Sequence, residues 1–407
     1  MTTHDASHDA PAAAPPVAHA ATTPQRPALQ SLLHALTHDY LLGILLLALL
    51  GLTLAAPARL PSYPGLVDWP TMATLTGLLM LTKGVEMSGF LNRLAQDLIV
   101  RMHSQRRLAL FLVSATALLA TVLTNDVALF VVVPLTLVLR RPVAATAVPD
   151  ATALPVTRLI MFEALAANAG STLTPIGNPQ NLYLWQQSHV SFASFTLAML
   201  PLALLLIAAL WVLTAWSFSG APNQIPAQRD DAGNPVRRGL LLTSLALYLP
   251  FLVMTDLHRA PLALAGVTIV FLVAYRRVLA RIDWALLLIF MLMFIDLRLI
   301  AAADPIRTLL GSADLARSTH LFLVAVGASQ VISNVPAAIL LAQYSDDWRV
   351  LAYGVNVGGA GLAIGSMANI IALRMAGERR AWLVFHAYAV PFLVVTGAAV
   401  LAWIAWR

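Results

Sequence analysis

The sequence contains no cysteine and few charged residues. The absence of cysteine from all 407 residues excludes disulfides, thiolate nucleophiles and Cys-ligated metals. Charged side chains make up 11% of the chain, roughly half the share of an average soluble domain. Hydrophobic residues make up 59%, and apolar runs of about 20 residues recur along the whole length. This composition predicts an all-α polytopic membrane protein.

The motifs of several enzyme classes are also missing. The sequence has no HExxH, no GxSxG nucleophile elbow and no Walker A loop, so we expect no enzyme activity and no cofactor. Its net charge of +6 is carried almost entirely by arginines in short loops, without interleaved aromatics, so we expect no nucleic-acid partner. The N-terminus has no cleavable signal-peptide pattern.

The chain divides into four regions. Residues 1–38 are rich in Ala, Pro, Thr and His and predict a disordered tail, whose histidines leave metal binding as an alternative. Two similar membrane regions follow at 39–218 and 259–407, joined by a cytoplasmic loop and linker helix at 219–258. Because arginine-rich loops stay in the cytoplasm, we expect the N-terminus inside and the C-terminus outside.

Two glycine-rich and asparagine-rich stretches interrupt the apolar pattern. They are NAGSTLTPIGNPQNL at 168–182 and NVGGAGLAIGSMANI at 356–370, and both predict a broken membrane helix. The residues that align, or that break the helix, are Asn168 with Asn356, Gly170 with Gly358, Gly177 with Gly365, Asn178 with Ser366, Asn181 with Asn369, and Pro175 in the first stretch alone.

Two further apolar runs are each cut in the middle. The run at 108–139 is interrupted at Thr124-Asn125-Asp126, and the run at 320–344 at Ser333-Asn334. A half of about 13 residues reaches only ~20 Å as a helix, too short for a ~30 Å hydrocarbon core. We therefore expect two re-entrant hairpins with Asn125 and Asn334 at their tips.

These landmarks recur in one order in both membrane regions. Asp68-Trp69 and Asp283-Trp284 each start a span, then come a hairpin, a broken helix and a closing span. The arginine count gives the two copies opposite orientations. The pattern predicts two inverted-topology repeats with about nine full crossings plus two hairpins, the architecture of alternating-access secondary carriers.

Helix breaks suit ligand binding because they leave backbone N–H and C=O groups without helical partners. Asparagine adds an acceptor and two donors without charge. A single membrane asparagine often only joins helices, but Asn125 and Asn334 stand at paired breaks, so we expect them to hold substrate or coupling ion.

The pairs TNDVALFVVVPL with NAGSTLTPIGNPQN, and SNVPAAIL with NVGGAGLAIGSMAN, resemble the ion transporter superfamily over about residues 70–406. That superfamily includes divalent anion/sodium symporters, arsenite-efflux permeases and one type of sodium/proton antiporter, and the chain looks most like anion transporters of the bacterial inner membrane. The resemblance implies a secondary transporter of a small anionic substrate, with Na⁺ as the only metal, in a lipid bilayer and as a homodimer. It also implies two ion sites, Thr124, Asn125 and Gly177 in one and Ser333, Asn334 and Gly365 in the other, with Asn178, Pro179 and Ser366 facing the substrate.

The chain departs from the symporter pattern at Asp126, where the family has Ser-Asn-Thr. An ionised aspartate would repel a carboxylate substrate, and the arsenite-efflux and antiporter branches have a similar Asn-Asp. The alternative function is therefore a cation/proton antiporter or an arsenite-type efflux permease that uses Asp126. A structural role, capping the second half of the hairpin, is the other interpretation of this residue.

Other charged residues lie within the spans. Lys83 and Glu86 are spaced to neutralise each other. Lys83 and Arg298 each follow a landmark tryptophan by fourteen residues, which fits either an anion path or snorkelling. We expect Asp296 to compensate Arg298, and Glu163 to lie at the membrane interface.

Overall fold

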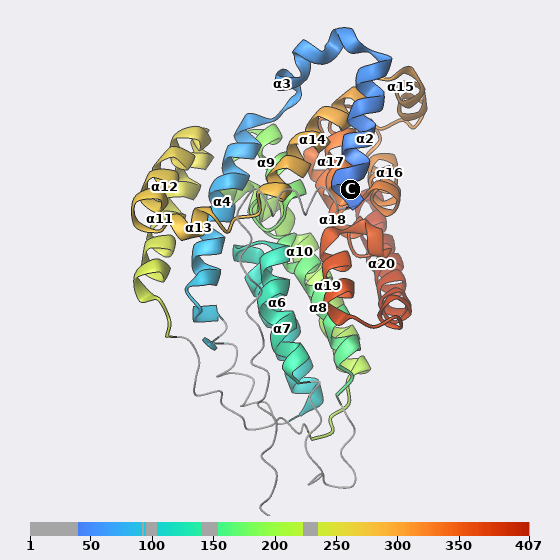
Figure 1. The fold of residues 1–407 in the computed structure, drawn as a ribbon. Helices are drawn as coiled ribbons and strands as arrows, with labels where there is room; N and C mark the ends of the chain where they lie inside the picture. The colour runs from blue at the N-terminus through green and yellow to red at the C-terminus, as the bar shows by residue number, and fades with distance from the viewer. Residues whose placement is uncertain (1–39, 92, 95–103, 140–153, 223–234, 407) are drawn as a thin grey trace, which may run out of the picture.

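The computed structural model describes residues 40–91, 93–94, 104–139, 154–222 and 235–406 (Figure 1). The predicted tail at 1–38 and most of the arginine-rich stretch at 92–107 lie outside these residues. Within the described ranges every extended element is a helix, and the one β contact is an isolated bridge between Ser104 and Pro222. The prediction of an all-helical protein is confirmed.

The first half of the chain forms a bent entry segment and a long helix. Two pairs of helices follow, each pair separated by a short interruption, and then a closing helix. The elements of this half are α2 (Tyr40–Ala55), η1 (Pro57–Ser62), α3 (Tyr63–Leu66), α4 (Trp69–Met87), α6 (Gln105–Val122), α7 (Asn125–Val138), α8 (Val156–Ser171), α9 (Pro179–Ser188) and α10 (Phe192–Ser217).

The second half repeats this order after one additional helix, α11. Its elements are α11 (Arg238–Asp256), α12 (Ala260–Ala274), α13 (Arg276–Leu279), α14 (Trp284–Ala301), α15 (Asp304–Gly311), α16 (Ser318–Ile332), α17 (Asn334–Leu341), α18 (Trp348–Gly358), η2 (Ala363–Gly365), α19 (Met367–Ala376) and α20 (Ala381–Trp406).

Five of the described helices, α6, α10, α11, α14 and α20, are long and apolar enough to cross a membrane. The segments Leu41–Ala55 and Pro57–Leu66, bent by 119° against each other, make a sixth candidate if they count as one span. The exposed side chains along these helices are largely Leu, Val, Ile and Trp, as expected for a surface in contact with lipid. The chain is therefore a polytopic membrane protein, while the count of nine crossings stays a prediction.

The spans α4 and α14 begin with the same local structure. The side chains of Asp68 and Asp283 each accept a hydrogen bond of 2.9 Å from the backbone N–H three residues later, which caps the helix. The indoles of Trp69 and Trp284 each donate to a carbonyl five residues earlier, at 3.0 and 3.1 Å. The two sequence landmarks thus adopt one conformation in both halves.

The four interruptions lie where the sequence predicts them. α6 and α7 pack side by side and meet at Thr124, and α16 and α17 do the same at Ser333. In Figure 1 the first pair lies in the lower half of the bundle and the second pair in the upper half. This placement agrees with hairpins that enter from opposite faces. The hairpins and the inverted orientation themselves stay predictions, since both depend on where the bilayer lies.

Glycine allows each broken helix to approach the neighbouring interrupted pair closely. A Cβ on Gly170 of α8 would overlap the backbone of Ala117 in α6. A Cβ on Gly358 of α18 would lie 2.6 Å from Cβ of Ser329 and 3.1 Å from the carbonyl of Val326 in α16. The aligned glycines therefore serve the same purpose, because each lets a broken helix touch the first helix of its neighbouring pair.

The two halves of the fold are interleaved at their centre. α9, which follows the first break, packs against α17 and α18 of the second half. α19, which follows the second break, packs against α7 and α8 of the first half. The helix that follows each break thus packs on helices of the other half. This arrangement brings the two breaks together at the centre of the fold.

Candidate functional site

The two helix breaks are joined by hydrogen bonds between asparagines that are about 200 residues apart in the chain. Asn168, in α8, donates from Nδ2 to Oδ1 of Asn369 at 2.8 Å. The Oδ1 atom of Asn168 accepts from the hydroxyl of Ser366 at 2.9 Å. All three side chains are buried. The first half of one broken helix is therefore bonded to the second half of the other.

The aligned residues make the reciprocal contacts. Asn356, in α18, donates from Nδ2 to Oδ1 of Asn181 at 2.7 Å. Its Oδ1 atom accepts from Nδ2 of Asn178 at 3.0 Å. Asn356 aligns with Asn168, and its two partners align with Asn369 and Ser366. Exchanging every residue for its aligned counterpart thus converts one set of bonds into the other.

The same side chains also satisfy the backbone groups that the breaks expose. Asn178 caps α9 by accepting from N–H of Asn181 at 2.9 Å, and Ser366 caps α19 by accepting from N–H of Ala368 at 3.3 Å. The amides of Asn181 and Asn369 donate to loop carbonyls, at distances down to 3.0 and 2.8 Å respectively. The asparagines therefore both close the helix ends and join the two breaks.

The remaining predicted residues of the breaks lie in the same region. Gly177, Pro175 and Gly365 are buried, and Pro179 is half-buried at the start of α9. A Cβ on Gly365 would lie 2.7 Å from the carbonyl of Gly358, and one on Gly177 would overlap the carbonyl of Ser171. Each break thus folds back tightly on the end of its preceding helix.

Two residues that the sequence interpretation missed join each broken helix to the interrupted helix pair beside it, α6–α7 in the first half and α16–α17 in the second. Thr121 in α6 donates to the carbonyl of Gly170 at 2.9 Å, and Gln330 in α16 donates to the carbonyl of Gly358 at 2.6 Å. Each stands four residues before the tip asparagine of its pair. Aligning the two interrupted runs on Asn125 and Asn334 would have placed Thr121 opposite Gln330 and so pointed to both, although their side chains differ.

The tips of both pairs are buried beside the breaks. Asn125 is 4% exposed, and its backbone N–H donates to the carbonyl of Gly177 at 3.0 Å. Asn334 is 2% exposed, and its Nδ2 lies 2.8 Å from where a Cβ on Gly359 would stand. The structure therefore brings each predicted tip asparagine to the predicted break of its own half.

Asp126 does not cap the second helix of the first pair. Thr124 does so, because its hydroxyl accepts from N–H of Val127 at 3.4 Å. Asp126 lies in the first turn of α7, with its own N–H donating to Oδ1 of Asn125 at 3.0 Å. Its carboxyl atom Oδ1 is buried and has no hydrogen-bond partner among the described residues. The capping interpretation of Asp126 is wrong, and the carboxyl group is available for another role.

The charged side chains in the spans form one expected pair and one unexpected pair. Lys83 and Glu86 form an ion pair at 2.9 Å, as predicted. Arg298 pairs with Asp68 at 3.7 Å and donates to the carbonyl of Leu66 at 2.8 Å. Asp296 is 1% exposed, and neither of its carboxylate oxygens has a hydrogen-bond partner in the described part of the chain. The predicted compensation of Arg298 by Asp296 is therefore wrong, because α14 turns Arg298 towards the start of α4.

The predicted interfacial position of Glu163 is also wrong. This side chain is 0% exposed and lies between α8 and α7, where its Oε1 atom accepts from the hydroxyl of Thr136. The polarity of glutamate suggested a membrane surface. The close packing of α7 and α8 instead encloses it completely.

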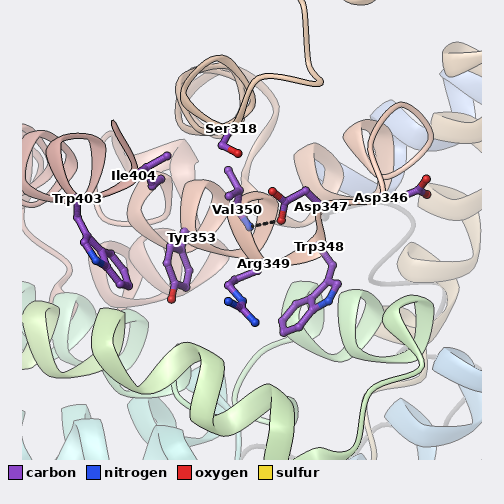
Figure 2. A pocket seen from close by; sticks show the side chains of 9 residues that line it. All are labelled: Ser318, Asp346, Asp347, Trp348, Arg349, Val350, Tyr353, Trp403 and Ile404. Atoms are coloured by element: carbon purple, nitrogen blue, oxygen red, sulfur yellow. Dashed lines mark hydrogen bonds between the residues drawn. The ribbon is translucent and has the colours of Figure 1, made fainter. Parts of the chain in front are cut away.

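A separate hollow lies away from the breaks. It is a cavity of about 470 Å³ beside α18. In Figure 2 the side chains of Trp348, Arg349 and Tyr353 point towards α10. Trp348 stacks on Phe195 with ring centroids 4.9 Å apart, and the Tyr353 hydroxyl donates to the carbonyl of Ala198 at 2.6 Å. None of the predicted site residues lines this cavity. It is an aromatic surface hollow, separate from the breaks.

A polytopic helical protein with paired polar helix breaks at its centre has the features of a membrane transporter. The comparisons agree, since the chain belongs to the citrate transporter (CitMHS) family, whose model matches residues 32–346. The inner membrane protein YbiR of Escherichia coli is 44% identical over 363 residues, covering 89% of this chain and 94% of YbiR. The uncharacterized transporter MJ0456 of Methanocaldococcus jannaschii is 32% identical, covering 76% of this chain and 82% of that protein. The chain is a transporter and not an enzyme.

A more distant match concerns a plant protein. The silicon efflux transporter LSI3 of rice is 31% identical over 135 residues, covering 33% of this chain and 26% of LSI3. The resemblance to the ion transporter superfamily that the break motifs suggested is thus confirmed at the level of family.

Proposed function

We propose that this chain is a secondary active transporter that moves a small anion or oxyanion across the bacterial inner membrane by alternating access. The observation that carries the proposal is the reciprocal exchange of bonds between the breaks, Asn168 with Asn369 and Asn356 with Asn181. Inverted repeats that meet at interrupted helices form the central sites of secondary carriers. The inner-membrane relative supports the location.

The polar groups around the breaks favour an anion. α7, α9, α17 and α19 all begin at tips or breaks, and helix N-termini carry partial positive charge. α9 packs against α17, and α19 packs against α7, so these helices meet in pairs across the two halves. The tip and break residues beside them are neutral, except for Asp126. A small anion can therefore bind here without a buried cation.

The coupling ion is Na⁺ or H⁺. In the Na⁺ form of the proposal, Thr124, Asn125 and Gly177 surround one ion, and Ser333, Asn334 and Gly365 surround the other. The bond from N–H of Asn125 to the carbonyl of Gly177 supports the first grouping, because it holds the hairpin tip on the break. Both groups offer hydroxyl, amide and carbonyl oxygens, the ligands that hard cations prefer.

The second candidate function is a cation/proton antiporter or an arsenite-type efflux permease. The buried and unpartnered Oδ1 atom of Asp126 favours it, because a carboxylate at the hairpin tip would repel an anion and attract a cation or a proton. The match to a silicon efflux transporter supports a weakly charged oxyacid as substrate in this case. We therefore treat Asp126 as the residue that separates the two functions.

Thermal stabilisation of the detergent-purified chain tests the proposal. A ligand at 100 times its dissociation constant stabilises the folded state by ~2.7 kcal/mol. We expect a shift with Na⁺ or acidic pH that grows with one anion from a panel of citrate, other dicarboxylates, sulfate and phosphate. The shift should disappear in Asn125→Ala and Asn334→Ala. It should persist in the control Ser114→Ala, whose hydroxyl bonds only to the carbonyl of Leu110 in its own helix.

The variant Asp126→Asn distinguishes the two functions. An unchanged anion shift in Asp126→Asn supports the anion transporter. A wild-type response to pH and arsenite alone, lost in Asp126→Asn, would replace it with the second candidate. The absence of any shift with every cation and anion of the panel would contradict both.

A further inference from the structure

Glu163 is a buried acid that the site at the breaks does not include. It is 0% exposed in α8, five residues or about 7.5 Å before Asn168 along the helix. Its Oε1 atom accepts from the hydroxyl of Thr136 in α7, which is also 0% exposed. Its Oε2 atom is buried and has no hydrogen-bond partner among the residues that the structure describes. An ionised carboxylate in this position would be strongly disfavoured without a neutralising partner.

The nearest arginine on the same helix is engaged elsewhere. Arg158 donates to the carbonyl of Ser217 at 2.7 Å. Its guanidinium lies over the rings of Phe218 and Tyr388, at 6.0 and 5.7 Å from their centroids. These contacts point the positive charge towards the end of α10 and towards α20, so Arg158 does not neutralise Glu163.

The described residues of the other helices packed on α8 supply no cation either. α10 has no titratable side chain, and Asp126 on α7 is itself an acid. Arg107 on α6 and Arg374 on α19 are exposed. On α6, Arg106 donates from Nε to the carbonyl of Phe218 at 3.0 Å. On α20, the ring of His386 lies between the carbonyl of Trp382 and the N–H of Ala363, at 2.7 and 3.1 Å.

The surroundings of Glu163 fit a proton better than a metal cation. A hard cation without its water takes about six oxygen ligands. The only hydrogen-bonded oxygen beside this carboxyl group is the hydroxyl of Thr136, and Oε2 faces no polar partner in the described residues. A proton needs no further ligands, and it converts the carboxylate into a neutral acid that can remain buried.

This acid has no counterpart in the second half of the chain. With the spacing that aligns Asn168 with Asn356, Glu163 aligns with Leu351, a buried apolar residue. With the spacing that aligns Asn125 with Asn334, Thr136 aligns with Ser345, beyond the end of α17. Residues needed for the architecture recur in both halves. The pair Glu163 and Thr136 occurs in one, which indicates a task other than forming the fold.

We propose that Glu163, positioned by Thr136, is the binding site for a coupling proton. The inference rests on the proposed transport function, of which it specifies the coupling ion. In this structure the acid is enclosed between α7 and α8. Because an ionised Glu163 requires water, release of its proton requires these two helices to separate. Proton binding is thereby linked to the movement of the hairpin against the broken helix.

Infrared difference spectroscopy tests proton binding without knowledge of the substrate, because the probe is H⁺ itself. Spectra of the purified full chain are compared between acidic and alkaline buffer. We expect a carbonyl band of a protonated carboxylic acid that decreases as pH rises and is absent in Glu163→Gln. The band should remain in Asp126→Asn and Asp296→Asn, and shift in Thr136→Val, which removes the hydroxyl. Persistence of the band in Glu163→Gln, or a band that does not respond to pH, overturns the proposal.

Transport in proteoliposomes tests the coupling. The substrate is the anion that stabilises the wild-type chain in the panel above. We expect folded Glu163→Gln to exchange labelled substrate across the membrane at the wild-type rate, within about twofold, and to lose accumulation driven by a pH gradient. Glu163→Asp should recover part of that accumulation. Full accumulation by Glu163→Gln, or loss of exchange as well, contradicts the proposal. If wild type transports nothing, the proposed function fails, and the infrared result alone decides whether Glu163 binds a proton.

Discussion

The two helix breaks perform the same structural task with different residues. Asn178 caps α9 and Ser366 caps α19. Each also bonds to an asparagine of the opposite half, Asn356 for Asn178 and Asn168 for Ser366. Thr121 and Gln330 likewise bind the carbonyls of aligned glycines with side chains of different length. Where a contact needs only a donor at one point, any side chain that supplies it is sufficient. The geometry is thus more similar between the halves than the sequence.

The interrupted pairs differ in ways that geometry does not require. Thr124 caps α7 in an extended conformation, whereas Ser333 has φ of 74° and ψ of 157° and provides no side-chain cap. Asp126 and Glu163 in the first half stand where the second half has Val335 and Leu351. Asparagines, glycines and caps therefore build the common architecture, whereas Asp126 and Glu163 have no acidic counterpart at the aligned positions of the second half.

The largest expected difference between the halves concerns the aligned glycines. Gly170→Ala should lower the free energy of unfolding by about 3 kcal/mol, because its Cβ would overlap the backbone of Ala117, which cannot move alone. Gly358→Ala should cost about 1–2 kcal/mol, because its nearest neighbour is the side chain of Ser329. The control Gly327→Ala, in open space on α16, should be neutral or stabilising. Denaturation in mixed micelles measures all three, and equal losses at Gly170 and Gly358 would refute the distinction.

The reciprocal bonds predict coupling between the breaks. In double-mutant cycles, Asn168→Ala with Asn369→Ala, and Asn356→Ala with Asn181→Ala, should each show a coupling energy of about 1–2 kcal/mol. Each single variant leaves a buried partner unsatisfied, which the double variant removes. The control cycle of Asn356→Ala with Ser114→Ala should be additive within about 0.5 kcal/mol. Additivity in both test cycles would argue against the reciprocal arrangement.

Glycine at the residue before each tip asparagine should change the free energy of unfolding in opposite directions. Ser333→Gly should raise the free energy of unfolding by about 1 kcal/mol, because glycine adopts this positive φ without strain. Thr124→Gly should lower it by about 1 kcal/mol, because it removes a cap and adds freedom to the unfolded chain. Thermal unfolding of the two variants side by side measures the difference. A loss of stability in both would show that Ser333 makes contacts worth more than its strain.

The smallest expected difference in stability between the halves concerns the ion pairs of the aligned cations Lys83 and Arg298. Glu86→Gln should change stability by less than about 0.5 kcal/mol, because Lys83 and Glu86 are 28% and 32% exposed and solvent weakens their attraction. Asp68→Asn should cost about 1 kcal/mol, because Arg298 and Asp68 are 18% and 9% exposed. Asparagine still caps α4, so the cap itself is unaffected. Urea denaturation in detergent compares the two, and a larger cost for Glu86→Gln would reverse the ranking.

Much of the fold could be predicted because its signals are local. Thr124, Asn178 and Ser366 cap helices that begin immediately after them, and a cap depends on residues within one turn. Lys83 and Glu86 pair within one turn of α4. The assignment of Arg298 and Glu163 failed because their environments come from helices far away in the chain. Asp68 lies 230 residues before Arg298, and α7 encloses Glu163.

The class of protein, the positions of the four interruptions and the family follow from patterns of consecutive residues. Apolar length, glycine and asparagine act over a few residues, so a single stretch of chain is enough to reveal them. The bonds of Asn168 with Asn369 and of Asn356 with Asn181, and the complete burial of Glu163, emerge only from the packing of the folded chain. The reason is physical: the partner of a buried polar side chain is set by the helix packed against it, and that packing is chosen by the whole chain.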